Sequence, residues 1–407
     1  MIFYEYNGFC LCPWCGEIPT EAVPVDECFD PLVFVAHYPP EEHRGVFRIG
    51  QLSELDAPET VDLLRQHQAE PARSALERFV LKHGATVLNT AFSNAYDVLK
   101  AMQKTAPFRV NLVGLGDVGG TVLTGLKLLG KEISEIGIYD PNTAQCQRYA
   151  LEMNQILPIT DGQELPPVVV RDVDALFDCD VLLFTASLGV PAVGSAVKDV
   201  RMAQYARNRD MLAQYAKAAR DCHFTGLFAQ ISDPVDHLCR AVFLASNRDE
   251  QGNFDGRGLL PEQIQGYGLG VMHARAEYYA KQLDLPFGAV FGPHGQDLIV
   301  ANAVDERYDD AISQRLTQAT VAANLDVRAL GFKPYLAPGL SSAAISVLRT
   351  LRGEWHDGAV PFGGAYFGCR SRMTRQGVQL EQLPLNLQLQ ARMELVHRTL
   401  REFDYDG

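Results

Sequence analysis

The chain has 407 residues, with 36 basic and 50 acidic side chains and a formal net charge of -14. Hydrophobic residues make up 47% and charged residues 21%, which excludes a disordered or collagen-like chain. The acidic balance argues against nucleic acid or an anionic membrane as a partner. No apolar run reaches the roughly 18 residues of a membrane-spanning helix, and the first residues do not resemble a signal peptide. We therefore expect a cytoplasmic protein of two or three domains.

Residues 1–107 differ in character from the rest of the chain. Prolines and cysteines are frequent up to about residue 50, and from about Leu52 to Lys104 the pattern turns helical. The segments TVDLLRQHQ (60–68) and ARSALERFVLKHG (72–84) place apolar residues three and four positions apart, which predicts two helices. Gly84 is well placed to end the second of them.

Four cysteines gather near the N-terminus: Cys10, Cys12, Cys15 and Cys28. Four thiolates suit a tetrahedral zinc ion or an iron–sulfur cluster, so these residues are candidate metal ligands. Cys12-Pro-Trp-Cys15 also has the spacing of a redox dithiol. The usual zinc pattern has two such pairs and this segment has one, so free cysteines in a packed segment are the competing interpretation.

From Phe108 onward, short apolar runs alternate with helical patterns. The segments FRVNLVGLG (108–116), EIGIYD (135–140), PPVVVRD (166–172) and DVLLFTAS (180–187) predict strands. Between them, VGGTVLTGLKLLG (118–130) and TAQCQRYALEMNQI (143–156) predict helices. This alternation predicts an α/β fold with a doubly wound parallel sheet.

A glycine-rich turn joins the first strand of this series to the first helix. Gly114, Gly116 and Gly119 form G-x-G-x-x-G, with Asp117 and Val118 inside the turn, and Asp140 ends the next strand. In a dinucleotide site such glycines allow a tight turn, a close approach to the pyrophosphate and close packing of helix on strand. Asp140 can accept hydrogen bonds from both ribose hydroxyls and would repel a 2′-phosphate, so NAD is favoured over NADP. A glycine-rich turn that binds another ligand is the alternative.

Seven segments between residue 108 and about residue 405 resemble, in order, motifs of the lactate/malate dehydrogenase family. They are DCDVLLFTAS, DVRMAQYARN, ISDPVDHL, QGYGLGVMHARA, FGPHGQD, YFGCRSRMTRQGV and LPLNLQLQARMELVHRTLRE. The resemblance implies a Rossmann NAD-binding domain (108–240), an α/β substrate domain (241–407) and an unmatched N-terminal extension (1–107). It also implies a homo-oligomer, either a dimer or a tetramer.

The resemblance further implies a set of site residues. His294 would transfer the proton, Arg275 would grip the substrate carboxylate, and Arg201 would polarise the carbonyl oxygen. The residues implied to line the cofactor site, besides the glycine-rich turn and Asp140, are Thr185, Ala186, Ser187, Asn208, Ser232 and Asp233.

Two departures from the family bear on this site. Met272 stands where the family has the aspartate that orients the catalytic histidine, and methionine can neither offset charge nor accept a useful hydrogen bond. Candidates for a replacement partner of His294 are Asp233 and Asp297, with His273 weaker. Gly194 stands where the family sets side-chain specificity, so a small, apolar or larger substrate fits better than a dicarboxylate.

The sequence thus predicts an NAD-dependent oxidoreductase that interconverts a 2-hydroxy acid and a 2-oxo acid, with a non-standard pocket for a small carboxylate. The alternative is an NAD(H)-binding sensor or regulatory protein without dehydrogenase turnover. Met272 favours the sensor, whereas His294, Arg275 and Arg201 favour the enzyme.

Overall fold

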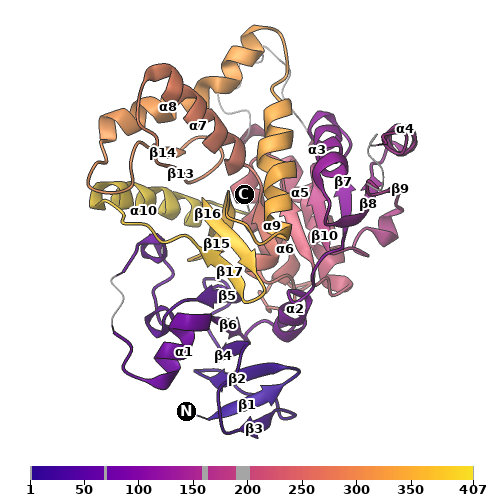
Figure 1. Ribbon diagram of the computed structural model, residues 1–407. Coiled ribbons are helices and arrows are strands. Elements are labelled where there is room, and N and C mark those ends of the chain that lie inside the picture. The colour runs from indigo at the N-terminus through magenta and orange to yellow at the C-terminus, as the bar shows by residue number, and fades with distance from the viewer. Residues whose placement is uncertain (1, 68–70, 158–163, 189–201, 407) are drawn as a thin grey trace.

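One continuous sheet runs through the molecule, as Figure 1 shows. The computed structural model describes residues 2–67, 71–157, 164–188 and 202–406. The strand order in the sheet is β3-β1-β2-β4-β6-β5-β17-β16-β15-β12-β11-β10-β7-β8-β9. No helix within the described ranges is long and apolar enough to cross a membrane.

Six parallel strands form one end of this sheet, and helices cover both of their faces. The strands are β7 (Phe108–Val113), β8 (Ile133–Tyr139), β9 (Val168–Val170), β10 (Val181–Phe184), β11 (Leu227–Gln230) and β12 (Ile264–Gly266). The helices that connect them include α3 (Asp117–Leu129), α4 (Thr143–Met153), α5 (Tyr205–Asp221) and α6 (Val235–Asn247). Strands β7 and β10 are buried almost throughout, as expected for a parallel sheet covered on both sides. The predicted doubly wound α/β architecture is confirmed.

The C-terminal half adds antiparallel strands and a second helical layer. Strands β15 (His356–Phe362), β16 (Ala365–Thr374) and β17 (Gly377–Leu380) extend the sheet beyond β12. The remaining elements are α7 (Leu269–Leu283), the hairpin β13 (Ala289–Phe291) and β14 (Ile299–Ala301), α8 (Asp310–Ala329), a π-helical segment (Pro338–Ala344), α9 (Ile345–Leu351) and α10 (Leu387–Arg401).

Residues 1–107 build the other end of the same sheet. Their strands are β1 (Phe3–Tyr6), β2 (Phe9–Pro13), β3 (Val23–Val25), β4 (Leu32–Ala36), β5 (Val46–Ile49) and β6 (Ala85–Asn89). Strand β5 pairs with β17 in parallel, with Phe47 opposite Val378, so the extension covers the edge of the sheet formed by residues 108–407. The division of the chain at residues 107 and 240 stays a prediction.

The two helices predicted in the extension had different outcomes. Helix α1 (Ala75–His83) forms with a capping box at Ser74 and Glu77, and it ends at Gly84, whose φ is 74°. The segment TVDLLRQHQ was predicted wrongly, because within its described residues, 60–67, only the 3₁₀ turn Val61–Leu64 forms. The chain then becomes extended at Arg65 and pairs with Leu383. A second short helix, α2 (Ala95–Ala101), follows β6.

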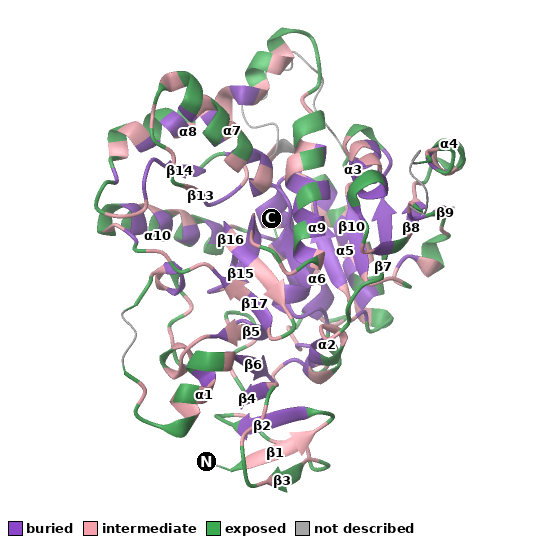
Figure 2. Cartoon of the chain, in the orientation of Figure 1, coloured by how far each residue is buried: buried purple, intermediate pink, exposed green. Residues whose placement is uncertain are grey.

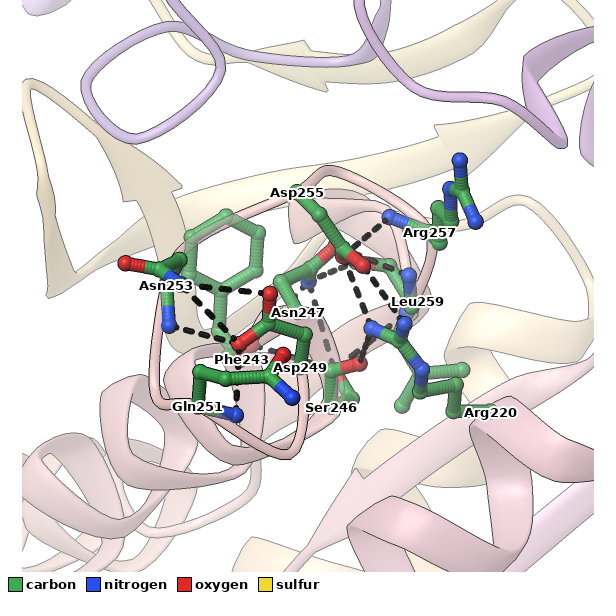
Figure 3. Close-up of polar contacts among 11 residues, drawn as sticks. Arg220, Phe243, Ser246, Asn247, Asp249, Gln251, Asn253, Asp255, Arg257 and Leu259 are labelled. Atoms are coloured by element: carbon green, nitrogen blue, oxygen red, sulfur yellow. Dashed lines mark hydrogen bonds and ion pairs between the residues drawn. The ribbon is translucent and has the colours of Figure 1, made fainter.

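An ordered polar loop after α6 stabilises the amino-terminal side of β12. Figure 3 shows Arg220 reaching Asp255 through two hydrogen bonds of 2.8 and 2.6 Å, while Asn247 holds Gly258 and Leu259. The loop also touches the extension, because the N–H of Ser93 donates to the carbonyl of Gly256 at 3.0 Å. Its position, away from the carboxyl ends of the parallel strands, indicates a structural role.

A buried carboxylate links the extension to the rest of the chain. Glu262 is 1% exposed, and its oxygens accept hydrogen bonds of 2.9–3.0 Å from the N–H groups of Gly45 and Val46, beside β5. Burial raises the pKa of Glu262 to about 7, although these backbone donors act to lower it. The junction therefore contains a carboxyl group whose ionised form is costly to bury.

We predict a pH-dependent stability from Glu262. The raised pKa means that the folded protein holds this proton more tightly than the unfolded chain does. The stabilising contribution is therefore present at acidic pH and is lost as the pH rises through about 7. Relative to Glu262→Gln, the free energy of unfolding of the wild-type chain should fall by roughly 2–3 kcal/mol between about pH 5 and about pH 8. Urea unfolding of both proteins measures this, and parallel pH profiles would contradict it.

Candidate functional site

The glycine-rich turn lies at the carboxyl end of β7 and opens α3. Gly114 has a φ of 94°, which favours glycine, and a Cβ at Gly119 would lie only 2.0 Å from the carbonyl oxygen of Gly114. A Cβ at Gly116 would meet nothing within 4 Å, so this position borders open space at the start of α3. Gly116 is also the N-cap residue and has no side chain to cap the first-turn N–H groups. Both features fit the phosphates of a dinucleotide.

Asp140 follows β8, beside the glycine-rich turn. Its carboxylate accepts the N–H of Leu115 at 2.9 Å and the N–H of Asn142 at 2.9 Å. Each oxygen thus has one backbone donor and keeps a lone pair for a ribose hydroxyl. Asp117, the first residue of α3, pairs with Lys333 at 2.9 Å, which offsets its negative charge near the phosphate position.

The ends of β10 and β11 bring the other predicted cofactor residues together. Thr185 donates to the carbonyl of Gly114 at 2.7 Å, and Ser232 donates to the carbonyl of Ala186 at 2.6 Å. Asn208 of α5 donates to Ser187 Oγ at 3.1 Å and to the carbonyl of Asp233 at 2.7 Å. Three segments distant in sequence are therefore linked into one wall beside the glycine-rich turn.

His294 lies on the loop after β13 and packs against the start of α7. A Cβ at Gly268, the N-cap of α7, would lie 2.4 Å from His294 Nδ1, so the imidazole rests on bare backbone. The N–H of His294 donates to Asp236 Oδ2 at 2.9 Å. Asp236 is 4% exposed and comes from the first turn of α6. An acidic side chain therefore lies close to the predicted proton-transfer residue.

Asp236 was not among the partners of His294 predicted from the sequence. The sequence predicted Asp233, Asp297 or His273 instead. The structure pairs His273 with Asp357 at 3.1 Å, and it leaves Asp297 exposed with a φ of 68°. The available signal for Asp236 was its place in the segment ISDPVDHL, where an acid opens a helix just after a strand ends.

Ser342 is a second residue that sequence analysis missed. Its hydroxyl accepts the N–H of Val271 at 2.9 Å and donates to the carbonyl of Gly268 at 2.7 Å. Val271 is the third residue of α7, which is the N–H that an N-cap side chain usually binds. Gly268 has no side chain, so Ser342, from the π-helical segment, caps α7 from outside. This contact fixes the backbone on which His294 rests.

Met272 does not provide a polar contact for His294 in the way an aspartate would. It is fully buried in an apolar cluster with Leu269, Ala276, Ala280, Val290, Leu298, Val300 and Leu316. Arg275, one turn further along α7, donates to Asn324 Oδ1 of α8 at 2.6 Å and lies 3.9 Å from Met272 Sδ. Arg201 and Gly194 lie outside the described residues.

The N-terminal cysteines do not support the predicted metal site. All four are described, and no group of three or more His, Cys, Asp or Glu side chains able to hold a metal occurs in the described ranges. Cys10 and Cys12 are buried in β2, whereas Cys15 is exposed beyond the end of that strand. Burial raises the pKa of Cys12 to about 11 and that of Cys28 to about 12, which disfavours thiolates. Cys10, Cys12 and Cys28 thus pack as thiols in one apolar cluster, and Cys15 lies outside it.

Comparison with known proteins identifies two curated relatives. No family model matches the chain. A malate dehydrogenase of Sulfurimonas denitrificans is 26% identical over 200 residues, which are 47% of this chain and 56% of that protein. An L-lactate dehydrogenase of Treponema denticola is 30% identical over 154 residues, which are 37% of this chain and 45% of that protein. The chain therefore spans about half the length of the curated relatives that it matches.

Solved structures share the fold. Malate dehydrogenase from Plasmodium falciparum superposes with a TM-score of 0.58 at 16% identity, covering 72% of this chain and 96% of that one. A minor L-lactate dehydrogenase from Enterococcus mundtii gives 0.58 at 17% identity, covering 73% and 97%. The chain thus has homologues among the malate and lactate dehydrogenases, and the resemblance found in its motifs is confirmed.

We predict that Asp140→Asn weakens NADH binding about tenfold, or about 1.4 kcal/mol. The amide keeps one acceptor oxygen for the backbone but cannot accept from both ribose hydroxyls. NADPH should bind relatively better, because the charge that repels a 2′-phosphate is gone. Fluorescence titration with both nucleotides measures this, with the exposed Asp172→Asn as control. Unchanged selectivity in Asp140→Asn would show that this carboxylate does not face the ribose.

A second prediction concerns Met272, which is fully buried among apolar side chains. Met272→Asp should lower the free energy of unfolding by several kcal/mol, because a carboxylate would enter an apolar cluster. Met272→Leu conserves volume and should cost less than about 1.5 kcal/mol. Urea unfolding compares the two. A stable Met272→Asp variant with faster turnover would contradict the described packing.

Proposed function

We propose that the protein is an NAD-dependent oxidoreductase that interconverts a 2-hydroxy acid and a 2-oxo acid. The observation that carries this proposal is the packing at Gly114 and Gly119 beside Asp140, at the carboxyl edge of the parallel strands. Ligands bind at this edge in open α/β sheets. The malate and lactate dehydrogenase homologues add support. We also propose that the protein is a homo-oligomer in the cytoplasm.

The residues that would hold NAD follow from the geometry. The start of α3 would receive the pyrophosphate, and Asp140 would receive the ribose next to the adenine. The wall formed by Thr185, Ser187 and Asn208, linked to Ser232 and Asp233, would border the nicotinamide. When bound, NAD supplies the acceptor for the hydride.

Residues in the second half of the chain would transfer the proton and bind the substrate carboxylate. His294 would take the hydroxyl proton during oxidation and return it during reduction. Asp236 holds the backbone of His294, and Ser342 holds the backbone under its ring. Arg275, steadied by Asn324, would grip the carboxylate in bidentate geometry. Arg201 would polarise the carbonyl oxygen, and Gly194 favours a substrate without a second carboxylate.

The second candidate function is an NAD(H)-binding sensor without turnover. The observation that favours it is the apolar environment of Met272, the position at which the family has its aspartate. Without a carboxylate there, imidazolium is stabilised less, and proton transfer by His294 is slower. The acid near His294, Asp236, contacts its backbone N–H and favours the enzyme.

We predict that the purified protein oxidises NADH with at least one monocarboxylic 2-oxo acid, and that His294→Ala lowers kcat by about 10²- to 10⁴-fold. NADH binding should not change in His294→Ala, because this side chain is not assigned to the nucleotide. Gly119→Val is the matched control, since its Cβ would collide with Gly114 and abolish nucleotide binding.

The outcomes separate the two candidates. NADH binding without turnover on any 2-oxo acid would reject the dehydrogenase and favour the sensor. Loss of NADH binding in the unaltered chain would reject both. Full activity in His294→Ala would remove this residue from the reaction.

A further inference from the structure

A polar cavity lies at the junction between the extension and the catalytic sheet, away from the candidate active site. Figure 1 shows β5 and β17 side by side at this junction, and both strands are mostly buried (Figure 2). The cavity has a volume of about 240 Å³. The extension contributes Arg44, Arg48, Gly50, Glu54 and Leu63, and the C-terminal part contributes Trp355, Gln379, Leu380, Glu381 and Gln382.

One part of the lining favours an anion. Arg48 Nε donates to a neutral amide oxygen, that of Gln376, at 2.9 Å. Arg372, on the neighbouring strand β16, likewise uses Nε for the amide oxygen of Gln379 at 2.9 Å. Burial, and the nearby charge of Arg372, lower the pKa of Arg48. A carboxylate placed at Arg48 would offset two like charges that are held close together.

Another part of the lining favours a cation. Glu54 Oε2 accepts the N–H of Gly50 at 3.1 Å, and Oε1 accepts from Gln382 at 3.4 Å, so both hydrogen-bond partners are neutral. Arg44 and Arg48 lie near enough to lower the pKa of Glu54, and burial outweighs them. The cation nearest to Glu381 is Arg370, at 3.9 Å. Burial raises the pKa of Glu54 and of Glu381. An ammonium group between these carboxylates would compensate their lost hydration.

Three apolar side chains also line the cavity. Leu63 and Leu380 line the cavity, and so does the ring of Trp355. The guanidinium of Arg372 lies 4.6 Å from the centre of that ring, which fixes its orientation. A ligand side chain directed at these groups should be apolar.

We propose that this cavity binds a small zwitterion, an α-amino acid with an apolar side chain. Its carboxylate lies at Arg48, its ammonium group lies between Glu54 and Glu381, and its side chain contacts Leu63, Leu380 and Trp355. Of the charged lining residues, Arg44 is paired with Glu59 at 2.8 Å, which leaves Arg48, Glu54 and Glu381 for a ligand with one charge of each sign. The site does not depend on the dehydrogenase reaction, and it is incomplete without the extension.

Binding at this cavity should stabilise the folded chain. The ligand would contact both sides of the junction at which β5 pairs with β17. A ligand that binds only the folded state stabilises it by mass action. The melting temperature of the full chain should therefore rise with the concentration of the amino acid.

The test is thermal unfolding and calorimetric titration of the full chain with the apolar α-amino acids. Two matched probes accompany each amino acid: its N-acetyl derivative, which lacks the ammonium group, and its amide, which lacks the carboxylate. We expect at least one free amino acid to bind, and both of its derivatives to bind at least tenfold more weakly. The ligand comparison needs only the unaltered chain, so the proposal can fail even if a variant does not fold.

Variants assign the binding to this cavity. Arg48→Gln and Glu54→Gln should each weaken binding at least tenfold, whereas the exposed control substitutions Arg78→Gln and Glu306→Gln should not. Failure of every amino acid to bind would overturn the proposal. Equal binding of the N-acetyl derivative or the amide, or unchanged affinity in both cavity variants, would also overturn it. None of these outcomes bears on whether NADH is oxidised.

Discussion

The candidate site depends on close contact between the first residues of α3 and α7 and the loops beside them. Glycine, at positions 119 and 268, permits this contact at both places. At Gly119 a Cβ would lie 2.0 Å from the carbonyl of Gly114, and at Gly268 it would lie 2.4 Å from His294 Nδ1. The first approach opens a helix N-terminus to a phosphate. The second seats the imidazole on backbone and removes the side chain that would cap α7, so that Ser342 must supply the cap. One steric constraint therefore shapes both halves of the site.

In the proposed function, Met272 stands where the resembled family has an acid, and Asp236 is an acidic side chain that lies near His294. Met272 completes an apolar cluster under α7, and Asp236 approaches from α6 to hold the backbone of His294. The hydrogen bond from the backbone N–H of His294 to Asp236 fixes the position of the histidine, and Met272 offers imidazolium no charge. The reaction, if it follows the proposed course, therefore relies more on Arg275 and on the positioning of His294.

Sequence patterns within short segments predicted the elements that contacts between neighbouring residues determine. The glycine-rich turn, the alternating strands and helices after Phe108, and the end of α1 at Gly84 all follow from short segments. The pairing of β5 with β17 joins opposite ends of the chain, and no local pattern encodes it. The same limit explains the cysteines, since spacing alone could not show that Cys10 and Cys12 are buried in a strand while Cys15 lies outside it. Asp236 and Ser342 were missed because their partners come from other elements.

The extension forms part of the same sheet as the rest of the chain and is not an attached module. Strand β5 covers an edge at β17 that would otherwise expose unpaired backbone groups, and Glu262 adds buried hydrogen bonds to the same junction. A junction built on a buried carboxylate and lined by four further charged side chains is expensive in desolvation. Hydrophobic contacts would join the two parts at lower cost. The proposed zwitterion would offset part of this desolvation cost, because it brings a partner of each sign to the charged lining.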